Sequence, residues 1–355
     1  MSDRLAPRAL IIGGSLGGLL TATTLRAIGW RVDVFERSPH ALDTRGGGLV
    51  LQPDVLHAFA FAGLRLPATL GVESGDRIFL DRAGNVVQRG WQPQTQTSWY
   101  MLYGVLRDAV PDECVHAGET LVRVEQAGGQ VRAHFAGGRI ETAELLVGAD
   151  GARSTVRELM LPDVRPAYAG YVTWRGLVPE GADGATAPGR RRWNWVWFRR
   201  VAQDKLPALL TDRDGRAHAF SLPPRCAPGR AWGSAPRRRG CDARAPFRAL
   251  VHATSEPFIQ AILDLAVPRM VFGRILLSGD AAFVPRPHTA GGAAKAAANA
   301  LALALALRKE DGPLDHRLQE WEVSQLRAGR TMTDWGKRMG DQIMGLDVAA
   351  EAVSQ

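Results

Sequence analysis

The opening segment of the chain contains the pattern that most restricts its fold. Residues 9–12 form a short apolar run of the kind found in buried parallel strands. After a glycine-rich turn, residues 16–28 have helical spacing and stop at Gly29, and residues 31–35 form a second apolar run. Because strand–helix–strand connections are right-handed, the two strands should lie side by side and parallel. The sequence therefore predicts an α/β fold that begins with a Rossmann-like unit.

The turn of this unit has the sequence Gly13-Gly14-Ser15-Leu16-Gly17-Gly18. A dinucleotide-binding turn needs small residues for the tight turn, for the approach of the pyrophosphate and for helix packing. Gly13 and Gly18 meet the first and last needs, and the Ser15 hydroxyl can itself donate to a phosphate. Glu36 ends the second strand, where a carboxylate can accept hydrogen bonds from a ribose. A turn that serves packing alone is the alternative, and Glu36 favours a dinucleotide.

A second motif lies in the middle of the chain, where an apolar run at residues 145–147 leads into Asp150-Gly151. Ser154 can then cap a short helix that carries Arg157. Taken alone, this pattern is also that of a plain strand, turn and helix.

The third motif is Gly279-Asp280, which follows the apolar run 275–277. Asp280 therefore lies at a strand end, where it can bind a sugar-like hydroxyl. A proline-rich loop and Gly291-Gly292 follow, and both permit the close approach of a planar ring. The alanine-rich helix after them would point its N-terminus at that ring and stabilise negative charge there.

The rest of the chain predicts further strands and one long helix. A hairpin is expected at 77–87, and strands are expected at 121–125, 131–135, 168–178 and 193–199, the last two in a second, antiparallel sheet. Residues 315–345 form an amphipathic helical pattern. The stretch 229–245 has no period, and we expect a surface loop there.

Composition excludes several functional classes. Hydrophobic residues make up 46% and charged residues 23%, as in soluble globular proteins. The net charge of +8 suits anionic cofactors as well as nucleic acid, but no nucleic-acid-binding module is present, so no such partner is expected. The chain has three cysteines without CxxC spacing, which argues against a disulfide framework and a metal site. No signal-peptide pattern opens the chain and residues 290–307 suit a buried helix, so we expect a cytoplasmic protein without membrane contact.

Together, the three motifs resemble those of the single-component flavoprotein aromatic hydroxylases, the p-hydroxybenzoate hydroxylase-like family, over most of residues 8–308. Several segments resemble the subgroup that acts on dihydroxypyridine-like rings: residues 13–18, Thr97-Ser98-Trp99, 193–197, 211–215 and 279–295. In that subgroup Ser15 is a regular feature, and so is Phe283 in place of the histidine common in the wider family.

The resemblance implies a Rossmann-like FAD-binding domain, interrupted by a mostly antiparallel β-sheet substrate domain and followed by C-terminal helices. The FAD-binding domain would comprise residues 1–75, 101–160 and 268–312, and the substrate domain residues 76–100 and 161–267. Residues 313–355 would form the C-terminal helical segment. A homodimer is the candidate oligomer.

The resemblance also implies non-covalently bound FAD, with NADH or NADPH as co-substrate. The residues that would contact the cofactors lie in the three motifs and beside them: Gly13, Ser15, Leu16, Gly18, Glu36, Arg37, Arg107, Asp150, Gly151, Arg157, Asp280, Pro287, Gly291 and Gly292.

The implied reaction hydroxylates a small, electron-rich aromatic or N-heteroaromatic compound with dioxygen, through a flavin hydroperoxide. The ring hydroxyl of the substrate must lose its proton, and His288 is the candidate base, since histidine titrates near neutrality. Aromatic side chains on the second sheet are candidate pocket walls, although core packing is the commoner role of such residues: Tyr171, Trp174, Trp193 and Trp195. Two alternatives remain open, a non-hydroxylating FAD oxidoreductase or epoxidase on the same scaffold, and an inactive FAD-binding homologue.

Overall fold

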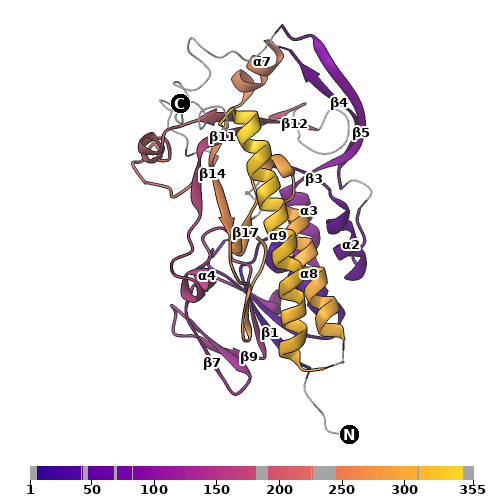
Figure 1. The fold of residues 1–355 in the computed structure, drawn as a ribbon, viewed down its shortest axis with the longest axis vertical. Coiled ribbons are helices and arrows are strands. Elements are labelled where there is room, and N and C mark those ends of the chain that lie inside the picture. Colours follow the sequence, from indigo (N-terminus) through magenta and orange to yellow (C-terminus); the bar gives the residue numbers. More distant parts are fainter. Residues whose placement is uncertain are drawn as a thin grey trace, which may run out of the picture.

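The computed structural model describes residues 6–40, 42, 47–67, 70–81, 83–180, 191–224, 226, 245–309 and 312–346 (Figure 1). Of the irregular stretch 229–245, only the last residue, which begins a helix, belongs to this described part.

A six-stranded sheet forms the centre of one half of the molecule, in the order β15-β16-β10-β1-β2-β6. Its strands are β1 (Arg8–Ile12), β2 (Arg31–Glu36), β6 (Val115–Ala117), β10 (Leu145–Gly148), β15 (Val271–Phe272) and β16 (Ile275–Leu277). All neighbours are parallel except the edge pair β15 and β16. Helix α1 (Leu16–Ala27) connects β1 to β2, which confirms the predicted strand–helix–strand unit. The central strands are buried because helices cover a parallel sheet on its faces.

The second sheet is antiparallel and has the order β12-β11-β14-β13. It consists of β11 (Ala167–Pro179), β12 (Arg192–Arg200), β13 (Ser221–Leu222) and β14 (Phe258–Ala266), and β17 (Phe283–Val284) pairs with β14. Strands β11 and β12 confirm the prediction for 168–178 and 193–199. Because side chains alternate along a strand, Tyr171, Thr173 and Arg175 share one face of β11.

Two smaller sheets and several short helices complete the body of the protein. The first sheet contains β3 (Gly48–Val50), β4 (Val72–Leu80) and β5 (Val86–Ser98), so the predicted hairpin 77–87 is the end of a longer one. The second contains β7 (Leu121–Ala127), β8 (Gln130–Phe135) and β9 (Ile140–Ala143). The helices are α2 (Pro53–Phe61), α3 (Trp99–Asp108), α4 (Thr155–Met160), α5 (Leu206–Leu209) and α7 (Ala245–Ala253).

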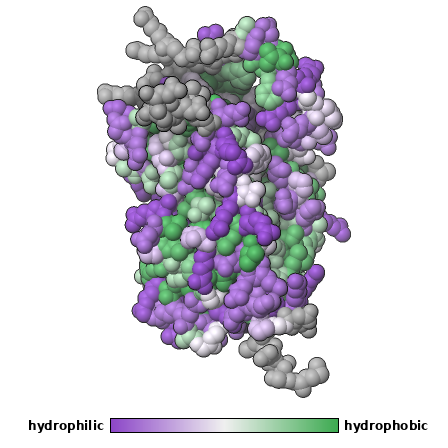
Figure 2. Space-filling model, in the orientation of Figure 1, coloured by the Kyte–Doolittle hydropathy of each residue, from purple (hydrophilic) through white to green (hydrophobic). Residues whose placement is uncertain are grey.

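Two long helices lie side by side along the molecule, α8 (Gly292–Arg308) and α9 (Leu314–Met344) (Figure 1). The small side chains of α8 let it pack closely against α1, and α9 continues past it to the second sheet. Thr333 and the glycines 329, 336 and 340 form the buried side of α9. The opposite side belongs to a largely hydrophilic surface (Figure 2). In the described part of the chain, no helix is both long enough and apolar enough to cross a bilayer.

Candidate active site

The three motifs and Glu36 meet at one edge of the parallel sheet, at the carboxyl ends of β16, β10, β1 and β2. Backbone hydrogen bonds join these ends: Gly13 N donates to Phe35 O at 2.8 Å, Ala149 N to Ile12 O at 2.8 Å and Ser278 N to Gly148 O at 2.9 Å. In open α/β sheets, ligands bind in the crevice outside this edge. Segments far apart in sequence are therefore assembled where a dinucleotide would bind.

The glycine turn is shaped by close backbone packing. Gly13 has a φ of +110°, and a Cβ there would lie 2.5 Å from Ala149 O. The first backbone bond of α1 runs from Leu19 N to Ser15 O, which leaves the N–H groups of residues 16–18 without an acceptor in the helix. Ser15 is the N-cap of α1, and its hydroxyl makes no capping hydrogen bond. Free amides and a free hydroxyl suit a phosphate.

Two backbone N–H groups hold the Glu36 carboxylate beside this turn. Its Oε2 accepts from Gly14 N at 2.8 Å and its Oε1 from Ser38 N at 2.9 Å. Each carboxylate oxygen keeps a second acceptor position, which is what a ribose diol requires. The adjacent Arg37 is exposed.

Asp150 carries a buried carboxylate oxygen for which the described residues offer no partner. Its Oδ2 accepts from Val156 N at 3.2 Å, while Oδ1 is shielded from solvent and unbonded. Burial raises the pKa of Asp150 and outweighs the hydrogen bonds from Ser154 and Val156 N, which lower it. Gly151 follows with a φ of +80°. Such an orphaned acceptor fits a bound group with hydroxyl or N–H donors.

Arg157 is 1% exposed and directs its guanidinium into the protein. It donates to Ala152 O at 2.7 Å, to Val164 O at 3.3 Å and to Ala281 O at 3.1 Å, and the last bond ties the Asp150 turn to the Gly279-Asp280 turn. As predicted, Ser154 caps α4, by accepting from Arg157 N at 2.9 Å. The geometry thus shows that Arg157 fixes two loops, and its contact with a cofactor stays a prediction.

Asp280 is paired with a lysine that the sequence analysis did not single out. Lys295, in the first turn of α8, is 3% exposed in its side chain, and its Nζ lies 2.6 Å from Asp280 Oδ1. It also donates to Phe283 O. Asp280 itself remains half exposed at the open edge. A lone lysine in an alanine-rich segment was the available signal for this partner.

The loop before α8 has an open side. Pro287 is exposed, and so is Gly292, where an added Cβ would meet no described atom within 4 Å. Gly291 is buried, and a Cβ there would lie 2.6 Å from Met332 Sδ. The start of α8 can therefore approach a flat ligand closely from one side while α9 supports it from the other.

His288, the candidate base, lies next to Tyr171, one of the candidate pocket residues. The Tyr171 hydroxyl lies 2.9 Å from His288 Nε2, and the His288 ring packs on Phe198 with a centroid distance of 4.3 Å. Burial and then the positive charge of Arg286 lower the pKa of His288, while burial raises the pKa of Tyr171 to about 12. At neutral pH His288 is uncharged and Tyr171 is protonated.

The three tryptophans predicted as pocket walls lie on the other face of the second sheet, which corrects that interpretation. Trp174 and Trp195 are buried in its separate hydrophobic core, and Trp195 Nε1 donates to Thr254 Oγ1 at 2.8 Å. Trp193 shares the face of Trp195, two residues away, and is 58% exposed. Their aromatic character serves this second core and its edge, not the face that carries His288.

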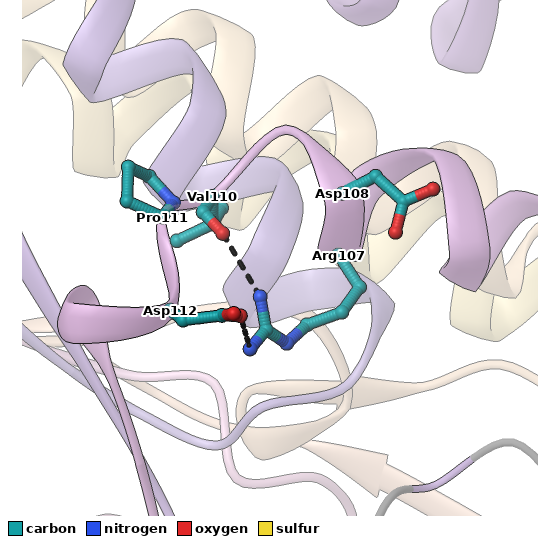
Figure 3. Close-up of a pocket in the computed structure, with 5 residues that line it drawn as sticks. All are labelled: Arg107, Asp108, Val110, Pro111 and Asp112. Carbon is teal, nitrogen blue, oxygen red and sulfur yellow. Dashed lines mark hydrogen bonds and ion pairs between the residues drawn. The ribbon is translucent and has the colours of Figure 1, made fainter.

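Arg107 forms hydrogen bonds with the residues that follow α3 (Figure 3). Its guanidinium donates to Val110 O at 2.9 Å and to Asp112 Oδ1 at 2.5 Å, and it lines a surface hollow together with Asp108 and Pro111. These bonds close the turn after α3. The contact between Arg107 and FAD stays a prediction, because the guanidinium keeps N–H donors beyond these two bonds.

Arg286 is a further residue that the sequence did not point to, because its partners are distant in the chain. Its Nε and Nη2 each lie 2.9 Å from an Asp264 carboxylate oxygen, and its Nη1 lies 2.6 Å from Asp341 Oδ1. The guanidinium also covers the Tyr171 ring. It connects β14, the loop of His288 and α9.

Comparisons with known proteins identify the family of the chain. A family model described as FAD binding domain-like matches residues 179–264. The chain is 35% identical to 2,6-dihydroxypyridine 3-monooxygenase of Paenarthrobacter nicotinovorans, over 96% of this chain and 92% of that protein. It is 28% identical to 6-hydroxynicotinate 3-monooxygenase of Bordetella bronchiseptica, over 87% and 85% of the two chains.

Solved structures show the same fold. The structure of 2,6-dihydroxypyridine-3-hydroxylase from Arthrobacter nicotinovorans superposes with a TM-score of 0.88 at 33% identity, and the match covers 96% of this chain and 94% of that one. Klebsiella pneumoniae HpxO, complexed with FAD and uric acid, superposes with a TM-score of 0.76 at 22% identity over 98% and 91% of the chains, a likeness of fold alone. By its identity to a curated relative along almost its whole length, the chain belongs to the family of FAD-dependent aromatic-ring monooxygenases.

Proposed function

We propose that this monooxygenase hydroxylates a small N-heteroaromatic compound of the dihydroxypyridine type. Two of the relatives are named for hydroxylated pyridine rings, which supports this substrate class. In the balanced reaction, the ring, dioxygen, NAD(P)H and a proton give the hydroxylated ring, NAD(P)⁺ and water. The electron donor is NADH or NADPH.

The observation that carries the flavin part of the proposal is the meeting of four strand ends at one sheet edge, where Asp150 Oδ1 has no partner among the described residues. We place the pyrophosphate of FAD at the free amides of α1, with Gly13, Ser15, Leu16 and Gly18, and the adenosine ribose at Glu36. Asp280 would hold the ribityl chain, with Asp150 and Gly151 beside it. Pro287, Gly291 and Gly292 would flank the flavin ring.

When bound, FAD supplies the redox chemistry, and the chain orients it and excludes water. His288 is suited to accept the proton of the ring hydroxyl. In the tautomer whose Nε2 donates to Tyr171 Oη, Nδ1 keeps a lone pair for that proton. The lowered pKa keeps His288 in this acceptor form at neutral pH.

We further propose the domain division given by the sequence, because the strand-end site lies in the proposed FAD-binding part and Tyr171 in the proposed substrate part. A homodimer and a cytoplasmic location remain part of the proposal, and size-exclusion chromatography with light scattering tests the first. FAD should be released when the protein is denatured, because no tethering motif accompanies a His or Cys.

The deciding experiment incubates the purified yellow protein with 2,6-dihydroxypyridine, other hydroxypyridines and phenols, with NADH or NADPH. Substrate-stimulated NAD(P)H oxidation with one hydroxylated product per NAD(P)H supports the proposal. Oxidation without a hydroxylated product, or with an epoxide, indicates the oxidoreductase or epoxidase alternative. Flavin that NAD(P)H cannot reduce with any of these compounds indicates an inactive homologue.

A further inference from the structure

Arg175 of β11 is a half-buried arginine that lies outside the proposed flavin site. It lies on the same strand face as Tyr171, four residues further along, which places the two Cα atoms about 13 Å apart at ~3.3 Å per residue. Tyr171 contacts His288 at one end of this face of β11, and Arg175 lies toward the other end.

The guanidinium of Arg175 has few hydrogen-bond partners for a half-buried charge. Its Nη2 donates to Gly48 O at 3.1 Å and its plane covers the Phe258 ring at 5.5 Å. Its Nε is buried and has no acceptor among the described residues. No carboxylate of the described chain forms an ion pair with it, in contrast to Arg286, which has two. Burial lowers the pKa of Arg175, and no negative group counters this effect.

The backbone beside this guanidinium is kept free of side chains. A Cβ on Gly47 would lie 2.6 Å from Arg175 Nη2, and a Cβ on Gly48 would lie 2.8 Å from Asn194 Nδ2. Residues with side chains at these two positions would displace Arg175 and Asn194. The glycines thus let the backbone lie directly against two groups that carry N–H donors.

A partly buried guanidinium that lacks a carboxylate partner favours the binding of an anionic group. Arginine presents its donors in a planar fork that suits an anionic oxygen, and its high pKa prevents it from acting as a base. We infer that Arg175 binds the ionised ring oxygen of the aromatic substrate and thereby selects rings that carry an acidic hydroxyl. This rests on the proposed function and adds to it a specificity-determining residue on the face of β11 that also carries Tyr171.

The inference is tested by ligand binding to the oxidised FAD-loaded protein, followed by the change in flavin absorbance. The probes are 2,6-dihydroxypyridine, which can ionise, and 2,6-dimethoxypyridine, which has the same ring and cannot. Wild type should bind the dihydroxy compound more tightly than the dimethoxy compound. In Arg175→Gln the dihydroxy compound should bind roughly ten- to a hundredfold more weakly, the range for a lost charge-assisted hydrogen bond. The dimethoxy compound should bind as before.

Two further variants sharpen the result. Arg175→Lys should fall between wild type and Arg175→Gln, because lysine keeps the charge but lacks the fork. Arg199→Gln is the matched control, since Arg199 lies on the neighbouring strand, covers the Trp197 ring and is exposed. It should bind both probes like wild type.

Three outcomes would overturn the inference: unchanged dihydroxypyridine binding in Arg175→Gln, equal weakening for both probes, or loss of FAD from the variant. If Arg175→Gln does not fold, the test uses the affinities of wild type for the two probes. Equal affinity for the dihydroxy and dimethoxy compounds would exclude an anion site and overturn the inference. A wild type that hydroxylates the ring while Arg175→Gln binds it normally contradicts only this inference. A wild type that hydroxylates no tested ring contradicts the proposed function instead.

Discussion

Burial shifts the pKa values of four groups in and near the proposed site toward the neutral form. The pKa of Asp150 is raised, and those of His288, Arg157 and Arg175 are lowered. Groups desolvated in this way concentrate at functional sites, where a bound molecule completes their surroundings. At the residue scale, the chain is therefore arranged for ligands along this edge.

Replacing Asp280 and replacing His288 by alanine should have different effects on FAD binding and on hydroxylation. Asp280→Ala should lose flavin and activity together, because the proposed ribityl contact and the pair with Lys295 are both removed. His288→Ala should keep FAD and still oxidise NAD(P)H, but with less hydroxylated product and more hydrogen peroxide. General-base help is typically worth about 10²–10⁴-fold, enough for the unproductive reaction to win. The ratio of product to NAD(P)H consumed, below the pKa of the substrate, is the measurement. Full coupling in His288→Ala would make His288 a loop residue only.

The lowered pKa of His288 also predicts how stability changes with pH. The unfolded chain, with a histidine pKa near the ordinary ~6.5, takes up the proton more readily than the folded chain. Stability should therefore fall as pH decreases from about 6.5 toward the lower folded value. Compared with His288→Gln, wild type should lose additional thermal stability in this acidic range and none above pH ~7. If the melting temperatures of wild type and His288→Gln change with pH in the same way from pH 5 to 8, the lowered pKa of His288 is refuted.

At the scale of elements, one guanidinium fastens α9 to the active-site loop. Arg286 is buried, bonds Asp264 of β14 and Asp341 of α9, and is covered by Tyr171. Gly340 makes this approach possible, because a Cβ there would lie 2.6 Å from the Tyr171 hydroxyl and 2.8 Å from Arg286 Nη1. The two carboxylates raise the pKa of Arg286 against the lowering effect of its burial.

Arg286→Gln should destabilise the protein by about 3–5 kcal/mol, the usual cost of leaving a buried charge unpaired, here on Asp264. The C-terminal half of α9 should exchange its amide hydrogens faster, because its attachment at Asp341 is lost. Arg327→Gln, at an exposed position of the same helix, is the control and should change neither quantity. Wild-type exchange rates near Asp341 in Arg286→Gln would show that packing alone holds α9.

The elements also show which parts of the site are accessible to sequence reasoning. The strand–turn–helix units at Gly13, Asp150 and Asp280 were predictable because each is a local pattern of apolar residues and glycines. The face of β11 that carries Tyr171 and the proposed substrate site was not predictable, since Trp174 and Tyr171 lie on one strand and only tertiary packing decides which side each faces. The partners of Arg286, Asp264 and Asp341, depend likewise on contacts between distant segments, for which the sequence carries no local signal.

At the scale of the whole molecule, the proposed FAD site joins segments from both ends of the chain. The turn at residues 13–18, Glu36, the Asp150 turn and the loop 279–292 belong to different elements that meet at one sheet edge. The loop 279–292 also contacts the second sheet and α9 through His288 and Arg286. A ligand that binds at this edge would therefore stabilise the fold as a unit.

Removing FAD should lower the unfolding temperature, and adding it back to the apoprotein should restore it. A ligand that binds only the folded state stabilises it by about 2.7 kcal/mol at a free concentration of 100 times Kd. FMN lacks the adenosine half, so it cannot use the α1 turn and Glu36 and should raise the melting temperature less at equal concentration. Asp280→Ala should show a smaller response to FAD than wild type, because it loses the ribityl contact. Equal effects of FAD and FMN would mean that the glycine turn holds no pyrophosphate and serves only to pack α1 against β10.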